Sequence, residues 1–431
     1  MESKNFLFVS IGALIGDIAW QISKEGHNVK YYIREESDQE VADGFVDKAD
    51  NYEDYIDWAD VIIFDDVLGQ GRIAQELRER GKKVIGGTVY TDRLEDDRSF
   101  GQEELKKHKV PILSYKEFHY FDDAIEYIEN NPSRYVIKPS GEAQNIKRLL
   151  FVGSEEDGSD VVRVLKAYRK IWSEEVKTFQ LQKKVSSGVE VAVGVFFNGS
   201  DFIYPININF EHKKLFPGNL GVATGEMGTS MFWSSPNKLF NATLKKFEET
   251  LRSEGYVGYI DINCIVNGSG IYPLEFTSRF GYPTISIQQD SMITPIGEFL
   301  YRLANGEKID LKVKRGFHIG ARVVVPPFPY KDEKTFDSFS RDAVILFRDK
   351  KKEGVHIEDT KLVNDEWLVT GHAGIPLVVV GSGKTMKQAQ RQLYQRISNI
   401  SIPNMYYRDD IGDRWFEDSD KLHNWGYLRE I

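Results

Sequence analysis

Residues 256–277 read YVGYIDINCIVNGSGIYPLEFT, two apolar runs separated by the tetrapeptide NGSG at 267–270. A polar, glycine-containing break between β-branched and aromatic runs predicts a β-hairpin. Side chains alternate between the two faces of a strand, so Glu275 and Thr277 share one face while the apolar residues beside them point into a core. The hairpin therefore places a carboxylate and a hydroxyl side by side.

Asp261, on the first strand of this hairpin, offers a second acid. It lies opposite Glu275 only if the connecting loop has an odd number of residues, whereas an even loop places Ile262 there. Two facing carboxylates repel each other unless a cation lies between them, so Asp261 and Glu275 predict a Mg2+ site. The alternative is that Asp261 caps its strand or pairs with Arg279.

The region before the hairpin is expected to be α+β with antiparallel sheets, because apolar alternation recurs there between turn signals. A helix is expected over residues 238–253. The predicted strands lie at residues 135–138, 149–152, 179–185, 189–197 and 202–210.

Three lysines in this region are candidates for phosphate contact. Lys138 ends a strand, Lys147 follows a short polar loop and Lys213 follows another strand. Phosphoryl transfer from ATP needs cations around the β and γ phosphates and oxygen ligands for Mg2+. These lysines and the hairpin acids would supply both, whereas each lysine alone is equally compatible with solvated surface.

The first ninety or so residues alternate short apolar runs with amphipathic ones, which predicts an open parallel sheet with helices between its strands. The first strand ends in SIGALIGDIAW (residues 10–20), where Gly12 and Gly16 open a helix. A glycine turn can present backbone N–H groups to a phosphate, but the G-x-G-x-x-G dinucleotide fingerprint is absent. The expected strands lie at residues 6–11, 27–33, 61–64 and 83–86.

A length of 431 residues predicts about three domains. We expect an N-terminal Rossmann-like domain at 1–92, a middle domain at 93–313 with a small subdomain at about 135–180, and a C-terminal α+β domain at 314–431. In the last of these, strands are expected near 321–325 and 377–380 and a helix over 385–397.

Composition narrows the function classes. The formal charge of −10 argues against binding to a nucleic-acid backbone. Cys264 is the only cysteine, so no intrachain disulfide or cysteine zinc site can form, which is typical of a cytoplasmic protein. No segment reaches the roughly 18 uninterrupted apolar residues of a membrane helix, so no membrane association is expected.

An ordered series of motifs then resembles a known family. In chain order these are YVIKPSGEAQNIK, LQKKVSSGVE, NFEHKKLFPGNLGVATGEMGTS, PLEFTSRFGYPTISIQ and MYYRDDIGDR. They resemble successive blocks of glycinamide ribonucleotide synthetase, the phosphoribosylamine–glycine ligase of purine synthesis, over nearly the whole chain. The resemblance implies an ATP-grasp fold that uses ATP and Mg2+.

The resemblance also assigns roles by position. Arg98, Lys138, Lys147 and Lys213 would face phosphate, and Glu190 the ribose. A hinge whose backbone holds adenine would comprise Gln182, Lys183, Lys184 and Val185. Glu275 matches a magnesium ligand, and Arg279 an arginine suited to grip a carboxylate or phosphate. Substrate contacts are implied for Gly12 and Glu211, and for a closing loop formed by Thr224, Gly225, Glu226, Met227 and Gly228.

This sequence departs from the family at several of these positions. Thr277 stands where the family has a metal-binding asparagine, so Asp261 is expected to replace it, and Asp261→Asn should weaken Mg2+ dependence more than Thr277→Ala. Glu226 replaces a glycine of the closing loop and would bring a new carboxylate to the acyl site. The turn after the first strand lacks the family's G-x-G-G-R-E-H-A run, which predicts a changed acceptor pocket.

The function expected from these features is an ATP-dependent carboxylate–amine ligase. An amino acid such as glycine would be activated as an acyl phosphate and passed to an amine, with Lys213 and Arg279 as catalytic groups. The acceptor is either phosphoribosylamine or another amine, such as a modified nucleotide or nucleobase. A non-catalytic ATP-binding protein is the remaining alternative.

Overall fold

The computed structural model describes residues 2–140, 150–171, 178–185 and 187–428. Its N-terminal part is a parallel sheet in the order β2-β1-β3-β4, flanked by helices, as the alternating apolar pattern predicts. Purely apolar strand segments such as Phe6–Val9 are buried because helices cover both faces of the sheet. These elements are β1 (Asn5–Ser10), α1 (Gly16–Lys24), β2 (Asn28–Ile33), β3 (Val61–Phe64), α2 (Gln70–Glu79), β4 (Val84–Ile85), α3 (Val89–Asp96) and α4 (Arg98–Lys107).

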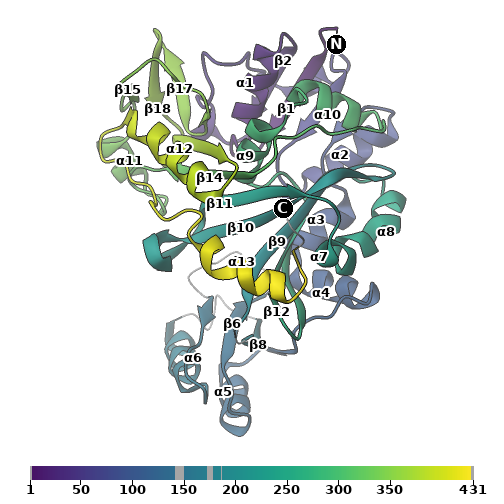
Figure 1. Cartoon of the computed structure of the whole chain (residues 1–431), viewed down its shortest axis with the longest axis vertical. Helices are drawn as coiled ribbons and strands as arrows, with labels where there is room; N and C mark the ends of the chain where they lie inside the picture. The colour runs from purple at the N-terminus through teal and green to yellow at the C-terminus, as the bar shows by residue number, and fades with distance from the viewer. Residues whose placement is uncertain (1, 141–149, 172–177, 186, 429–431) are drawn as a thin grey trace.

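A small antiparallel sheet projects from one end of the molecule, at the bottom of Figure 1. Its strand order is β5-β8-β6-β7, and helices α5 and α6 pack on it around a core of their own that includes Phe121, Ile137 and Leu165. The predicted strands here are confirmed within the described residues. The elements are β5 (Tyr115–Phe118), α5 (Phe121–Asn130), β6 (Tyr135–Pro139), β7 (Phe151–Val152), α6 (Ser159–Ile171) and β8 (Phe179–Lys183).

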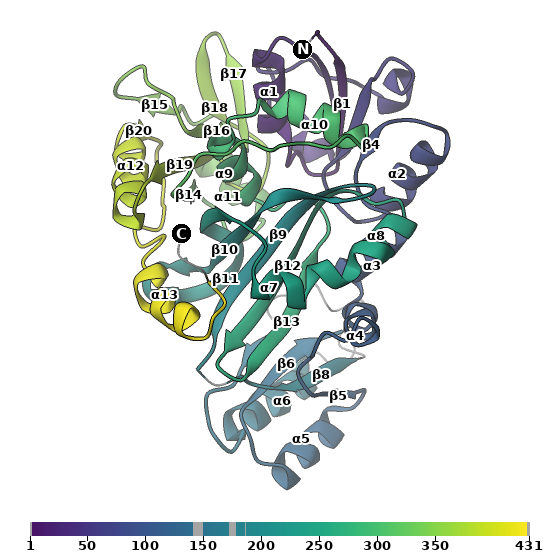
Figure 2. The same ribbon diagram turned by 45° about the vertical axis from the view of Figure 1, so that its right-hand side comes forward.

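The largest sheet has eight strands in the order β13-β12-β9-β10-β11-β14-β19-β16. It crosses the expected domain limit at residue 314, because β14 pairs with β11 on one side and β19 on the other. Figure 2 shows its β12 and β13 running toward the small sheet. The strands are β9 (Val189–Asn198), β10 (Phe202–Phe216), β11 (Leu220–Ser234), β12 (Val257–Asn267), β13 (Gly270–Thr277), β14 (Phe317–Val323), β16 (Val355–Ile357) and β19 (Leu377–Gly383).

Two expectations about local structure are wrong. The segment predicted to be a closing loop, residues 224–228, lies inside strand β11, because residues 228–234 pair in register with 206–212 of β10. The helix expected over 238–253 is broken at Thr243, whose backbone is non-helical and whose hydroxyl donates to the carbonyl of Leu239 at 2.6 Å. The resulting pieces are α7 (Lys238–Ala242), a 3-10 helix (Leu244–Phe247) and α8 (Glu248–Ser253).

The remaining elements cover the edges of this frame. Helices α9 (Thr284–Ser291) and α10 (Ile296–Ala304) follow the hairpin, and helix α12 lies close to the expected range. Among the described helices none is long and apolar enough to cross a bilayer. The C-terminal elements are α11 (Glu333–Phe339), β15 (Leu346–Phe347), β17 (Thr360–Val363), β18 (Glu366–Val369), α12 (Met386–Ser398), β20 (Ile400–Ser401) and α13 (Arg414–Asn424); further 3-10 helices are Glu36–Asp38, Tyr52–Tyr55 and Pro217–Asn219.

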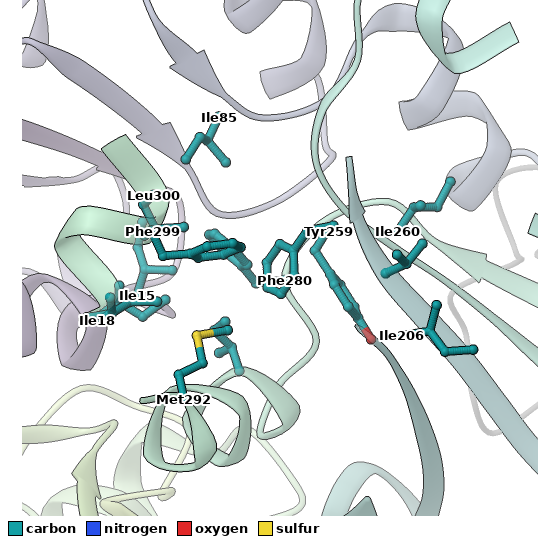
Figure 3. Packing of buried hydrophobic residues seen from close by; sticks show 14 of the residues in the cluster. Ile15, Ile18, Ile85, Ile206, Tyr259, Ile260, Phe280, Met292, Phe299 and Leu300 are labelled. Carbon is teal, nitrogen blue, oxygen red and sulfur yellow. The ribbon is translucent and has the colours of Figure 1, made fainter. Parts of the chain in front are cut away.

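One apolar core joins the N-terminal sheet to the eight-stranded sheet. Figure 3 shows Phe299 of α10 beside Phe280 and Tyr259, with Met292 below and Ile85 above them. The ring centroids of Phe299 and Phe196 are 4.8 Å apart in an edge-to-face arrangement, which aromatic pairs prefer. The end of the hairpin that carries Asp261 and Arg279 is therefore held against the N-terminal part of the molecule.

Candidate functional site

The hairpin register decides which polar groups face each other. Strands β12 and β13 pair Asp261 with Thr277 and Asn263 with Glu275, after a register shift at Pro273. The connection is a two-residue turn, and the shift beyond it is a β-bulge near a proline that has no N–H to give the ladder. The expectation that Asp261 or Ile262 lies opposite Glu275 is therefore wrong: Asn263 takes that place.

Lys213 is the centre of an ionic cluster on this face. Its Nζ lies 3.1 Å from Glu190 Oε1, 3.1 Å from Glu211 Oε2 and 2.9 Å from Glu275 Oε1. Burial opposes its charge, but the carboxylates of Glu211, Glu275 and Glu190 outweigh it and raise the pKa of Lys213 well above the ordinary value. In return, Lys213 lowers the pKa of Glu275 to about 2. The two residues are therefore charged together at neutral pH.

Lys138 is a second cation near this cluster, on strand β6 of the small sheet. It is only 8% exposed, and within the described residues its ammonium group forms no hydrogen bond or ion pair. Burial and then the charge of Arg98, at the start of α4, lower the pKa of Lys138 to about 7. A buried lysine held next to another cation is stabilised by an anion, so this corner of the molecule is suited to phosphate.

A cavity of about 510 Å³ lies between the small sheet and the eight-stranded sheet. Pro139 and Leu150 line it from one side and the hairpin from the other, and its volume suits a small-molecule ligand. Lys138 lies immediately before Pro139, beneath the lining. The predicted site residues that line the cavity are Arg98, Glu211, Lys213, Thr224, Gly225, Glu226, Asp261, Glu275, Thr277 and Arg279.

Other predicted site residues lie around this cavity and do not form its lining. Gly12 follows β1 and faces Asp38, while Met227 and Gly228 are packed into strand β11. Lys147 lies outside the described residues. Gln182 and Lys183 end strand β8, where Lys183 is exposed, and Lys184 with Val185 follow it, the Lys184 ammonium donating to the carbonyl of Gly153 at 3.0 Å.

Arg279 is already paired with carboxylates of the N-terminal part. Its Nη2 lies 3.0 Å from Glu95 Oε1 and its Nε 3.6 Å from Asp66 Oδ1. Glu95 also accepts the backbone N–H of Ser278 at 2.7 Å, so the acid is held in place. The guanidinium that was expected to grip a substrate anion is thus neutralised within the protein.

Asp261 is buried and is not paired with Arg279, so that alternative is also wrong. It accepts hydrogen bonds from Asn209 Nδ2 at 3.1 Å and Tyr259 Oη at 3.2 Å. Burial and then the charge of Glu211 raise the pKa of Asp261 well above the ordinary value. Burial thus disfavours the carboxylate form that a metal ligand needs, and Asn209 and Tyr259 already donate to the Asp261 Oδ2.

Asn263 carries a buried oxygen that could serve the predicted metal site. Its Nδ2 donates to Glu190 at 2.8 Å and Glu211 at 3.2 Å, while its buried Oδ1 has no partner within the described residues. No group of three or more His, Cys, Asp or Glu side chains in the described part of the chain is arranged for a metal ion. The oxygens of Asn263 and Glu275 fit a Mg2+ that takes its other ligands from substrate phosphates and water.

Two residues near this cluster, Arg414 and Asn263, are not among the predicted site residues, although Arg414 ends the motif MYYRDDIGDR. Arg414 of α13 donates to the backbone carbonyls of Glu211 and Glu190, at 2.7 Å each. Asn263 was detectable, because it lies two residues after Asp261 and hence on the same strand face. The arginine is far away in the chain, and only the packing of α13 on β9 and β10 brings it here (Figure 1).

Comparison with known proteins agrees with this architecture. The model of the phosphoribosylglycinamide synthetase ATP-grasp (A) domain matches residues 96–285. The phosphoribosylamine–glycine ligase of Streptococcus pneumoniae R6 is 24% identical over 361 residues, 81% of this chain and 82% of that protein. The enzyme of the same name from Halalkalibacterium halodurans is 22% identical over 356 residues, 79% of each chain.

Solved structures show the fold at lower sequence identity. The phosphoribosylamine–glycine ligase of Thermotoga maritima superposes with a TM-score of 0.70 at 19% identity, covering 94% of this chain and all of that one. The biotin carboxylase domain of Hydrogenobacter thermophilus 2-oxoglutarate carboxylase, in complex with MgADP, gives 0.62 at 13% identity and 99% coverage of both. The chain therefore has the ATP-grasp fold, carries a phosphoribosylglycinamide synthetase A domain at residues 96–285, and is a distant homologue of the phosphoribosylamine–glycine ligases.

Proposed function

We propose that this protein is an ATP-dependent carboxylate–amine ligase that forms an amide through an acyl phosphate. The observation that carries the proposal is Lys138, which has no ion-pair partner among the described residues and lies beside Arg98, next to a cavity lined by Lys213 and Glu275. A buried lysine of this kind, near an acid and an amide oxygen, suits a nucleoside triphosphate with its metal. ATP-grasp relatives named as ligases support the same reaction class.

Each group has a role in this proposal. Arg98 and Lys138 neutralise phosphate charge, and Lys138 takes up a proton as the anion binds. The ammonium group of Lys213, held by three carboxylates, would also stabilise negative charge on the transferring phosphoryl group. Mg2+, held through Glu275 and Asn263, would supply further charge neutralisation on the phosphates. Glu190 would contact the ribose, and the backbone of residues 182–185 the adenine.

The chemistry has two steps. A substrate carboxylate oxygen attacks the γ phosphorus, and ADP leaves with the electron pair of the broken P–O bond. The amine nitrogen then bonds to the acyl carbon as phosphate leaves, and the nitrogen gives up one proton. Enclosure between the two sheets protects the acyl phosphate from water.

The proposal also concerns which acid and which amine are the substrates. Glycine as the acid is supported by the printed names of the sequence relatives. With phosphoribosylamine as the acceptor, the protein would act in purine synthesis. A different amine is the second candidate, and one specific observation favours it: Arg279, the expected grip for an anionic group, is occupied by Glu95 and Asp66.

The test is ADP release from MgATP with a panel of amino acids, with and without phosphoribosylamine generated in place. Turnover that requires glycine and phosphoribosylamine would assign the first acceptor, and turnover with another amine would assign the second. Lys138→Met serves as the matched inactive variant. Absence of ADP release under every condition, together with unimpaired ATP binding, would refute the ligase and leave a non-catalytic ATP-binding protein.

A further inference from the structure

The remainder of the cavity is rich in acids. Beyond the groups assigned to the nucleotide and its metal, the charged side chains lining it are Glu95, Asp96, Glu211, Glu226, Asp261, Arg279 and Arg322. Carboxyl groups outnumber guanidinium groups there by five to two. This excess of carboxyl groups disfavours an anionic ligand if neither arginine can bind it.

Both arginines are already neutralised by the protein. Arg279 pairs with Glu95 and with Asp66, which lies just outside the lining. Arg322 pairs with Glu358 at 3.1 Å, and its other terminal nitrogen donates to the backbone carbonyl of Glu226 at 3.1 Å. A phosphate entering this region would compete with Glu95, Asp66 and Glu358 for the charge of these guanidinium groups.

Two of the acids have no cation of their own. Asp96 and Glu226 form no ion pair within the described residues, and both line the cavity. Burial, followed by the charge of Asp66, raises the pKa of Asp96. These carboxyl groups carry a desolvation penalty that a bound cation would relieve.

Of these two acids, Glu226 gives the stronger evidence for a cation site. Its side chain is 7% exposed, and its buried Oε1 has no partner within the described residues. Burial and then the charge of Glu211 raise its pKa well above the ordinary value. Arg322 and Lys213 act in the opposite direction, but each is already paired with carboxylates. An anion placed here would also meet Glu211 and Asp261, whereas an ammonium would supply the missing partner.

We propose that the acceptor is an aliphatic amine with a second cationic group and no phosphate, and that Glu226 binds that second group. The inference rests on the proposed ligase function and specifies its acceptor. The free amine of the acceptor attacks the acyl carbon, phosphate leaves with the bonding electrons, and the nitrogen loses one proton. The ammonium at Glu226 takes no part in the bond change. Diamines and polyamines share this chemistry with basic amino acids.

The test is equilibrium binding of putrescine, lysine and phosphoethanolamine to the whole protein with a non-hydrolysable ATP analogue and Mg2+. Putrescine or lysine should bind at least about tenfold more tightly than phosphoethanolamine. Cation binding should also release protons, because a neighbouring cation lowers the pKa of Glu226, which burial and the charge of Glu211 hold above its ordinary value. Calorimetry in two buffers of different ionisation enthalpy measures this release. Tighter binding of phosphoethanolamine would overturn the proposal.

Glu226→Gln keeps the shape of the side chain and should weaken cation binding about tenfold while abolishing proton release. Glu104→Gln is the matched control: Glu104 is also 7% exposed, but it pairs with Tyr90 and Lys107 and does not line the cavity. Asp96→Asn gives a second variant should Glu226→Gln not fold. Unchanged cation binding in the variants would sink the idea. Binding of the ATP analogue alone tests the nucleotide site separately, so failure of the ligase proposal is distinguishable.

Discussion

Replacing Lys138 by methionine should weaken nucleotide binding and at the same time raise the free energy of unfolding. Burial and Arg98 lower the pKa of this lysine from 10.5 to about 7. At 1.36 kcal/mol per pKa unit, holding the charged form in the fold costs about 5 kcal/mol, an upper value for pH below 7. Lys138→Met removes that penalty, so its free energy of unfolding at pH 6 should exceed that of the unmodified protein.

The sign of the pH dependence follows from the same shift. Between pH 7 and 10.5 the unfolded chain keeps a proton at Lys138 that the folded chain has lost, so this lysine makes stability rise with pH there. A bound triphosphate restores the proton. ATP affinity should therefore fall as pH rises above 7, by as much as about tenfold per unit, with uptake of one proton on binding.

Calorimetric titration of MgATP from pH 7.5 to 9.5 measures both quantities. In Lys138→Met the affinity should be lower at pH 7.5 by about tenfold or more and should no longer depend on pH through this group. Lys166→Met, on the exposed face of the small unit, is the control and should bind as the unmodified protein does. A pH-independent affinity in the unmodified protein, or normal ATP binding by Lys138→Met, would refute the assignment of Lys138 to the phosphates.

Three further predictions concern the surrounding charges. Arg279→Met removes the ion pairs with Glu95 and Asp66 and should lower the free energy of unfolding by about 3–5 kcal/mol, whereas Arg302→Met, in a surface network with Glu298 and Glu307, should lower it by less than about 1 kcal/mol in urea denaturation. Asn263→Ala should raise the Mg2+ concentration needed for half-maximal ATP binding at least about tenfold, and more than Asp261→Asn or Thr277→Ala does; a larger effect at Asp261 would restore that residue as the ligand. Arg414→Ala frees the carbonyls of Glu190 and Glu211 and should raise the Kd for ATP several-fold, while Lys421→Ala on the same helix should not; equal effects would exclude a positioning role for Arg414.

The sequence predicted the larger elements well because hydrophobic periodicity depends only on neighbouring residues. Strand β3 was placed exactly where it lies, and helix α12 within one residue at each end. Strand β11 escaped notice, since its glycines and threonines resemble a loop and only pairing with β10 makes it extended. Local pattern thus failed where a long-range partner decides the conformation.

In the candidate site, too, the local sequence predicted some features and long-range packing decided the others. Alternation along β13 correctly put Glu275 and Thr277 on one face, but it left the face of Asp261 open, and the bulge at Pro273 shifted the pairing by one residue so that Asn263 lies opposite Glu275. No pattern in the sequence predicts that Arg279 forms ion pairs with Glu95 and Asp66, because these acids come from another part of the fold. Electrostatic partners far apart in sequence are set by tertiary packing, and the availability of a charge for substrate depends on them.

The uninterrupted eight-stranded sheet has a mechanical consequence. Strands β14, β19 and β16 are bonded edge to edge with the strands that carry Glu211, Glu226 and Glu275, so the C-terminal third cannot swing away without breaking a ladder of backbone hydrogen bonds. Among the described residues the small sheet shares no hydrogen-bonded strand pair with the eight-stranded sheet, and it has a separate core. A nucleotide should therefore enter and leave by a hinge motion of the small sheet, which carries Lys138, relative to the rigid eight-stranded sheet.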